Sequence, residues 1–175
     1  MHAEIHNDFK AFVEGAHSPE TYQQILAEAG LDAASFEDQA YHNDGDMDRA
    51  LNAAGTILSQ SRLDFLTEMG IAGSPGLLEA FEGYREDGWN VLDLLEHIEP
   101  RMHKHVREEM GAFPPALKTE RLSDTEVRID ILSHRNFAGL ANGFITGFAA
   151  HYGDTVDIRL DESDTGYTFH VVKTN

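Results

Sequence analysis

The sequence contains no cysteine among its 175 residues. Disulfide bonds, thiolate catalysis and cysteine-ligated zinc or iron–sulfur sites are therefore excluded. Basic residues are also scarce, since 13 Lys and Arg stand against 31 Asp and Glu and give a formal net charge of −18. Because this charge repels phosphate backbones and anionic membrane surfaces, we expect no binding to nucleic acid.

Long apolar runs are lacking as well, and no stretch approaches the roughly 20 residues that a bilayer span requires. The opening MHAEIHNDF has no basic segment followed by an apolar run, so it does not have the pattern of a secretory signal. We therefore expect no membrane insertion and a cytoplasmic location. The length suits one domain that buries a substantial core.

Enzyme motifs are not evident either. No Ser-His-Asp arrangement can be placed, the carboxylates are scattered, and no glycine-rich phosphate loop follows a strand. We therefore predict that the protein is not an enzyme.

The first ninety residues have the apolar spacing of helices. Ser18 and Pro19 are typical of a helix start, and Gly30 of a helix end. The stretch Gly73–Gly76 (GSPG) is expected to break the chain. The predicted helices cover about 9–16, 21–29, 47–59, 62–69 and 77–85, whereas 33–41 is ambiguous.

The pattern changes after Pro114-Pro115. A helix that Asn90 can cap precedes this point, and Pro100 should kink or restart it. Beyond it the spacing predicts strands at 116–121 and 126–132, a helix at 137–152, and a hairpin of 156–160 with 167–171. We therefore predict one α+β domain, 1–175, with a helical lobe at about 1–90 and an α/β lobe with a small antiparallel sheet at about 91–175.

Two histidines lie in the stretch EPRMHKHV. His103 borders the apolar stripe of its helix, whereas the helical neighbours of His105 are mainly charged. A histidine beside an apolar face is most often an ordinary core residue. A zinc site is disfavoured because the pair lies two residues apart without an assured third ligand. An imidazole that faces an apolar cavity does suit haem, whose iron takes a proximal histidine.

Four segments resemble the haem-nitric-oxide-binding (H-NOX) family, in the form of its stand-alone bacterial members. They are MHAEIHNDFKAFVEGAHSPETYQQILAEAGL, LLEAFEGYREDGWNVLDLLEHIEPRMHKHV, GAFPPAL and VRIDILSHRNFAGLANGFITGFAAHYGD. They follow in the family's order and run almost from end to end. The resemblance implies a helical distal lobe and a proximal α/β lobe that clasp a b-type haem (protoporphyrin IX iron).

The resemblance places the proximal iron ligand at His103, three residues before the aliphatic Val106. A gapless count back from Gly111 favours Met102 instead. Because Met102 belongs to the apolar stripe, we expect His103 to be the ligand.

The family carries a Tyr-x-Ser-x-Arg signature that holds the haem propionates. Ser133 and Arg135 match it, but Ile131 stands at the tyrosine position. Without the resemblance, both residues read as a strand-end turn with a solvated arginine. Loss of the phenol is expected to weaken haem binding by about 1–2 kcal/mol. The sequence is therefore also compatible with a family relative that does not bind haem.

Three further positions follow from the resemblance. Pro115 matches a proline that packs against the porphyrin, although it would also suit a linker between lobes. Ile5 matches an apolar residue of the distal wall, a position that any core isoleucine could fill. Leu140 stands where dioxygen-binding members carry a distal tyrosine, so selectivity for nitric oxide over dioxygen is implied.

The resemblance thus implies a sensor of nitric oxide. Nitric oxide would bind ferrous haem, weaken the bond to His103 and shift one lobe relative to the other. A separate signalling protein, such as a histidine kinase or a cyclic-di-GMP enzyme, would read the change. The alternative is a relative without haem, an interaction module for another apolar ligand or a protein partner, which Ile131 and Pro100 favour.

Overall fold

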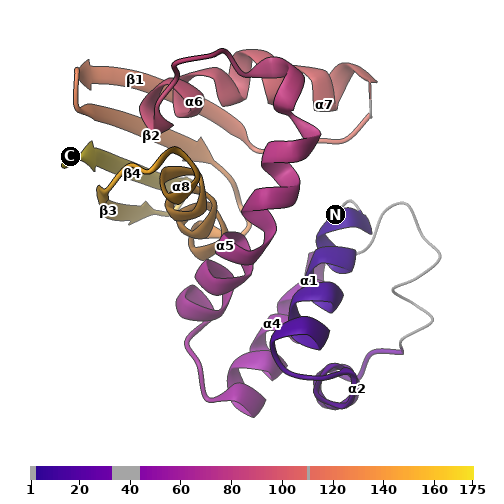
Figure 1. Ribbon diagram of the computed structural model, residues 1–175. Helices are drawn as coiled ribbons and strands as arrows, with labels where there is room; N and C mark the ends of the chain where they lie inside the picture. The colour runs from indigo at the N-terminus through magenta and orange to yellow at the C-terminus, as the bar shows by residue number, and fades with distance from the viewer. Residues whose placement is uncertain (1–2, 33–43, 110) are drawn as a thin grey trace.

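A computed structural model describes residues 3–32, 44–109 and 111–175. Helices α1 (Ala3–Ala16), α2 (Pro19–Glu28) and α4 (Asp44–Leu58) lie together on one side of the molecule, and α5 (Arg62–Ala80) runs from them to the other side (Figure 1). The ambiguous segment 33–41 falls outside the described residues. In the described ranges, no helix is both long and apolar enough to cross a membrane.

The other side contains a four-stranded sheet and the remaining helices (Figure 1). The sheet has the order β1-β2-β4-β3, and each neighbouring pair is antiparallel. The predicted α+β class, strands and hairpin are confirmed. The elements are η1 (Glu82–Tyr84), α6 (Val91–His97), η2 (Ile98–His103), α7 (Lys104–Glu109), β1 (Ala116–Ser123), β2 (Glu126–Leu132), α8 (Ala138–Tyr152), β3 (Val156–Ser163) and β4 (Gly166–Lys173).

Side chains of one face of the sheet form the first hydrophobic core with α6 and α8. Val127, Ile129 and Ile131 of β2 point to this face, because alternate residues of a strand share a face. Phe169 and Val171 of β4 join them and are fully buried. The opposite face carries mainly polar and charged side chains, as expected of an antiparallel sheet covered on one side.

A second hydrophobic core joins α1, α2, α4 and α5. Phe9 and Phe65 are fully buried there, with ring centroids 5.7 Å apart. Helix α8 contributes to both cores, since Leu140 belongs to the second and Phe148 to the first, while Phe144 packs against both. The two cores therefore meet along α5 and α8.

The predicted helix ends are largely confirmed. Ser18 caps α2 by accepting a hydrogen bond from the Thr21 amide at 3.1 Å, and Asn90 caps α6 in a reciprocal capping box with Asp93. Gly153 closes α8 with a positive φ of 70°.

Helix α5 runs through the stretch that was expected to break it. The prediction of two helices, 62–69 and 77–85, is therefore wrong. Pro75 has no N–H for the carbonyl of Ile71, four residues earlier. The buried hydroxyl of Ser74 donates to that carbonyl instead, at 2.8 Å. The side chain of Ser74 thus satisfies the acceptor that the proline leaves, and the helix continues to Ala80.

Pro100 has the effect predicted for it. The chain turns as a π-helix over Ile98–His103, between the α-helical segments α6 and α7. A π-helical turn contains more residues than an α-helical turn and often lies at a functional site. His103 is its last residue.

Helices α5 and α8 are in backbone contact at their glycines. A Cβ added to Gly143 would lie 2.8 Å from the Cα of Gly70, and one added to Gly139 would lie 2.5 Å from the carbonyl oxygen of Leu63. Real Cβ atoms do not approach this closely. The glycines Gly139, Gly143 and Gly147, spaced by four along α8, therefore allow close contact with α5.

We expect Gly143→Ala to lower the free energy of unfolding by about 3 kcal/mol, at the upper end of the range for overpacking, because backbone atoms must move. Urea denaturation measures this change. Gly15→Ala on α1 is the control, since a Cβ there meets nothing within 4 Å and alanine favours a helix. Equal stability of the two variants would contradict the close backbone contact.

Candidate functional site

Sheet pairing gathers most of the predicted proximal residues at one end of β1, β2 and β4. Ala116 of β1 pairs with Leu132 of β2. Pro115, just before β1, and Ser133, just after β2, therefore lie next to each other. Tyr167 of β4 pairs with Ile131 on the other side of β2.

His103 lies beside this end and is held by a carboxylate. Its Nδ1 is 3.0 Å from Oε2 of Glu99, four residues earlier, and its side chain is 19% exposed. Glu99 also accepts a hydrogen bond from the Leu117 amide of β1 at 3.2 Å and pairs with Arg107. One carboxylate therefore connects η2, α7 and β1.

The protonation of this pair follows from its surroundings. Burial raises the pKa of Glu99, but hydrogen bonds from Arg107, His103 and the Leu117 amide outweigh it and hold that pKa below its ordinary value. Burial lowers the pKa of His103, against the opposing effects of Glu99 and the Pro115 carbonyl.

An ionised carboxylate only accepts hydrogen bonds, so Nδ1 of His103 carries a proton. Because the lowered pKa keeps the ring neutral near pH 7, Nε2 bears the lone pair. A neutral imidazole whose other nitrogen donates to a carboxylate is the usual form of a metal-ligating histidine.

The two neighbours that competed with His103 lie elsewhere. Met102 is 5% exposed and belongs to the first core. The ring of His105 packs on Tyr84 of η1 with centroids 5.2 Å apart, a contact that its helical neighbours did not indicate.

Ser133 and Arg135 form a tight turn after β2. The Ser133 hydroxyl accepts a hydrogen bond from the Arg135 amide at 3.1 Å. The phenol of Tyr167 joins them and donates to the Arg135 carbonyl at 3.3 Å. Sequence reasoning missed Tyr167, since only the strand register places it beside this turn.

The predicted distal residues lie in the other core. Ile5 of α1 is half-buried against the second core, and Leu140 of α8 is a member of it. Pro115 is exposed in the loop before β1. The structure therefore brings together the proximal residues, and it places Ile5 and Leu140 together in the second core.

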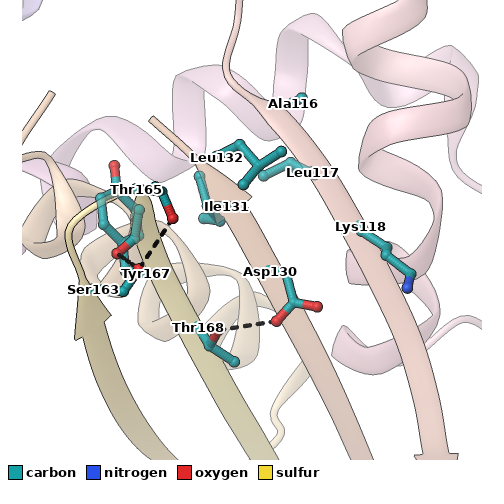
Figure 2. Close-up of a pocket in the computed structure, with 11 residues that line it drawn as sticks. Ala116, Leu117, Lys118, Asp130, Ile131, Leu132, Ser163, Thr165, Tyr167 and Thr168 are labelled. Carbon is teal, nitrogen blue, oxygen red and sulfur yellow. Dashed lines mark hydrogen bonds between the residues drawn. The ribbon is translucent and has the colours of Figure 1, made fainter. Parts of the chain in front are cut away.

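A hollow of about 390 Å³ opens at the same end of the sheet, and Figure 2 shows the residues that line it. Ile131 and Leu132 form an apolar part. Lys118, Asp130 and Thr168 form a polar part, in which Thr168 donates to Asp130 at 2.9 Å. Its polar part distinguishes this open hollow from the enclosed apolar pocket that a porphyrin requires.

Comparison with known proteins defines the class. A family described as haem-NO-binding matches residues 3–160. The chain therefore belongs to the haem-NO-binding (H-NOX) family, which comprises haem-based sensors of nitric oxide and other gases. A search of curated proteins by sequence finds no match.

Solved structures share the fold at low sequence identity. The Fe(II) unliganded H-NOX protein from K. algicida is 18% identical with a TM-score of 0.88, and the match covers 100% of this chain and 97% of that one. The H-NOX protein from S. oneidensis in the Fe(II)NO state is 16% identical with a TM-score of 0.83, and both chains are covered completely. The I5F mutant of T. tengcongensis H-NOX is 14% identical with a TM-score of 0.82, covering 100% and 98%.

The donor set of the site fits a haem. Among the described residues, no group of three or more His, Asp or Glu side chains is arranged to hold a metal ion. Iron at His103 would thus need ligands that the protein does not supply, and porphyrin nitrogens are such ligands. The hydroxyls of Ser133 and Tyr167 and the guanidinium of Arg135 are suited to the carboxylates of the same group.

We expect Glu99→Gln to lower the pKa of His103 further in the apoprotein, because the imidazolium loses its ionised acceptor. Two-dimensional NMR of the histidine side chains, followed against pH, measures this. In the native chain, the pKa of His103 lies below its value of about 6.5 in the unfolded chain. The contribution of the neutral ring to the free energy of unfolding is therefore complete above pH 6.5 and is lost as the pH falls below it. Glu108→Gln, at an exposed position of α7, is the control, and a His103 pKa unchanged in both variants would contradict the assignment.

Proposed function

We propose that this chain is a haem-based sensor of nitric oxide, with His103 as the proximal ligand of a ferrous b-type haem. The observation that carries the proposal is the His103–Glu99 pair, which holds a neutral imidazole beside Pro115 and the Ser133–Arg135 turn. Membership of the haem-NO-binding family supports it. The geometry favours His103 over Met102, because the ring of His103 meets Glu99 whereas Met102 is buried in the first core.

The proposed roles of the other residues follow their places in the fold. Ser133 and Arg135 would hold propionates, and Pro115 would contact the proximal face of the porphyrin. Ile5 and Leu140 would form the distal wall. When bound, haem supplies the ferrous iron at which nitric oxide binds.

The proposed selectivity for nitric oxide over dioxygen comes from the apolar side chains of Ile5 and Leu140. Neither side chain has a hydrogen-bond donor. Bound dioxygen would gain no polar stabilisation from them, whereas nitric oxide needs little. The proposed sensor therefore responds to nitric oxide in the presence of air.

Glu99 offers a path from His103 to the rest of the chain. Any displacement of the His103 ring changes its hydrogen bond to Glu99, which is bound in turn to the Leu117 amide and to Arg107. Strand β1 and helix α7 would thus respond together. A ligand drives such a shift only by its different affinity for the two arrangements. A separate signalling protein, a histidine kinase or a cyclic-di-GMP enzyme, is the proposed reader.

The second candidate is a family relative that has lost haem and binds another apolar ligand or a protein. Ile131 favours it, because this side chain replaces the signature phenol and is 6% exposed within the first core. Absorption spectroscopy separates the two candidates. The protein is expressed with ample haem supply, reduced without oxygen, and measured before and after nitric oxide. A Soret band that shifts with nitric oxide and ignores air supports the sensor, and a colourless protein that refuses haem supports the relative.

We expect His103→Ala to abolish the haem spectrum or to make it depend on added imidazole, because the variant removes the proximal ligand. His105→Ala is the matched control and should leave the spectrum nearly unchanged, since that ring packs on Tyr84. Loss of the spectrum in His105→Ala alone would overturn the assignment, and loss in Met102→Leu alone would transfer it to Met102.

A further inference from the structure

The end of the sheet near His103 contains three hydrogen-bond donors of different kinds. They are the phenol of Tyr167, the hydroxyl of Ser133 and the guanidinium of Arg135. The phenol donates to the Arg135 carbonyl, and the Ser133 hydroxyl lies within hydrogen-bonding range of it. In a chain with a net charge of −18, such a group of donors is suited to an external carboxylate.

The register of the sheet accounts for the position of the phenol. Tyr167 and Ile131 are directly paired on β4 and β2, so their side chains share the inner face of the sheet. Figure 2 shows the two residues on these neighbouring strands. Tyr167 therefore brings a phenol to the strand position at which Ile131 has none.

Gly166 allows this close pairing. Its φ is 153°, and a Cβ at this position would clash with the Ile131 carbonyl oxygen and lie 3.2 Å from the Ser133 amide nitrogen. Any other residue would push the start of β4 away from β2. The glycine thus holds Tyr167 next to the Ser133–Arg135 turn.

Tyr167 is 9% exposed, and the hydrogen bond that its phenol donates is a long one. Its hydrogen bond to the Arg135 carbonyl is 3.3 Å long, beyond the usual 2.5–3.0 Å for an O–H donor, so exchange for a charged acceptor is favourable. Burial raises the pKa of Tyr167, against Ser133, the Phe137 backbone and the Arg135 charge, which lower it. The hydroxyl therefore stays protonated and can donate at neutral pH.

We propose that Tyr167, from the neighbouring strand, supplies the phenol that Ile131 lacks and binds one porphyrin carboxylate together with Ser133 and Arg135. This inference rests on the proposed haem function. It assigns the third donor of the carboxylate site to β4 instead of β2.

The test compares haemin with its dimethyl ester, in which both carboxylates are blocked. Each is loaded into the full-length apoprotein, and its rate of loss to excess apomyoglobin is measured. We expect Tyr167→Phe to speed the loss of haemin roughly tenfold, as for one hydrogen bond to a charged group. Loss of the dimethyl ester should be nearly unchanged by the same substitution.

Tyr152→Phe is the matched control, because the Tyr152 hydroxyl is buried without a hydrogen-bond partner among the described residues. It should leave both rates unchanged. Thermal unfolding of each apoprotein shows whether the variants fold. If Tyr167→Phe does not fold, Ser133→Ala replaces it, because it removes another donor to the same carboxylate and should also speed the loss of haemin but not of the ester.

The outcomes separate the two proposals. If the native chain takes up neither porphyrin, the haem function fails and this inference fails with it. If the native chain binds haemin and Tyr167→Phe behaves like Tyr152→Phe, only the role of Tyr167 is overturned. Equal acceleration for haemin and its ester would show a merely structural role and would overturn the inference as well.

Discussion

The backbone contact between α5 and α8 sets the position of nearly every other element. Gly70 and Gly143 bring the two helices together without intervening side chains. Because α8 packs under the sheet and α5 reaches the helices around Phe9 and Phe65, this contact fixes one core against the other. The turn that carries Arg135 leads directly into α8, so the candidate site is anchored to the same contact.

Glu99 has a comparable importance within the site. Its carboxylate accepts hydrogen bonds from His103, Arg107 and the Leu117 amide, which belong to three different elements. These donors keep it ionised, and the ionised carboxylate in turn determines which nitrogen of His103 carries the proton. The chemistry of the imidazole is therefore set by contacts outside its own turn.

Local signals predicted much of the fold. Ser18, Asn90 and Gly153 mark helix ends through their own backbone and side-chain chemistry, and strand alternation identified both hairpins. The continuation of α5 through Pro75 was not predictable in this way, because it depends on the side-chain hydroxyl of Ser74. The nearness of Tyr167 to the turn after β2 depends on pairing between strands that are far apart in the sequence, which no local pattern records.

The π-helical turn at Ile98–His103 has a consequence for comparing this chain with its relatives. A π-helical turn contains more residues than an α-helical turn, so the side chains in and after it do not follow the α-helical spacing of three and four residues. A comparison that assumes an unbroken α-helix here would therefore assign the wrong neighbours to the residues around His103. Residues of this turn are therefore best matched to those of relatives by superposing the structures, not by aligning the sequences.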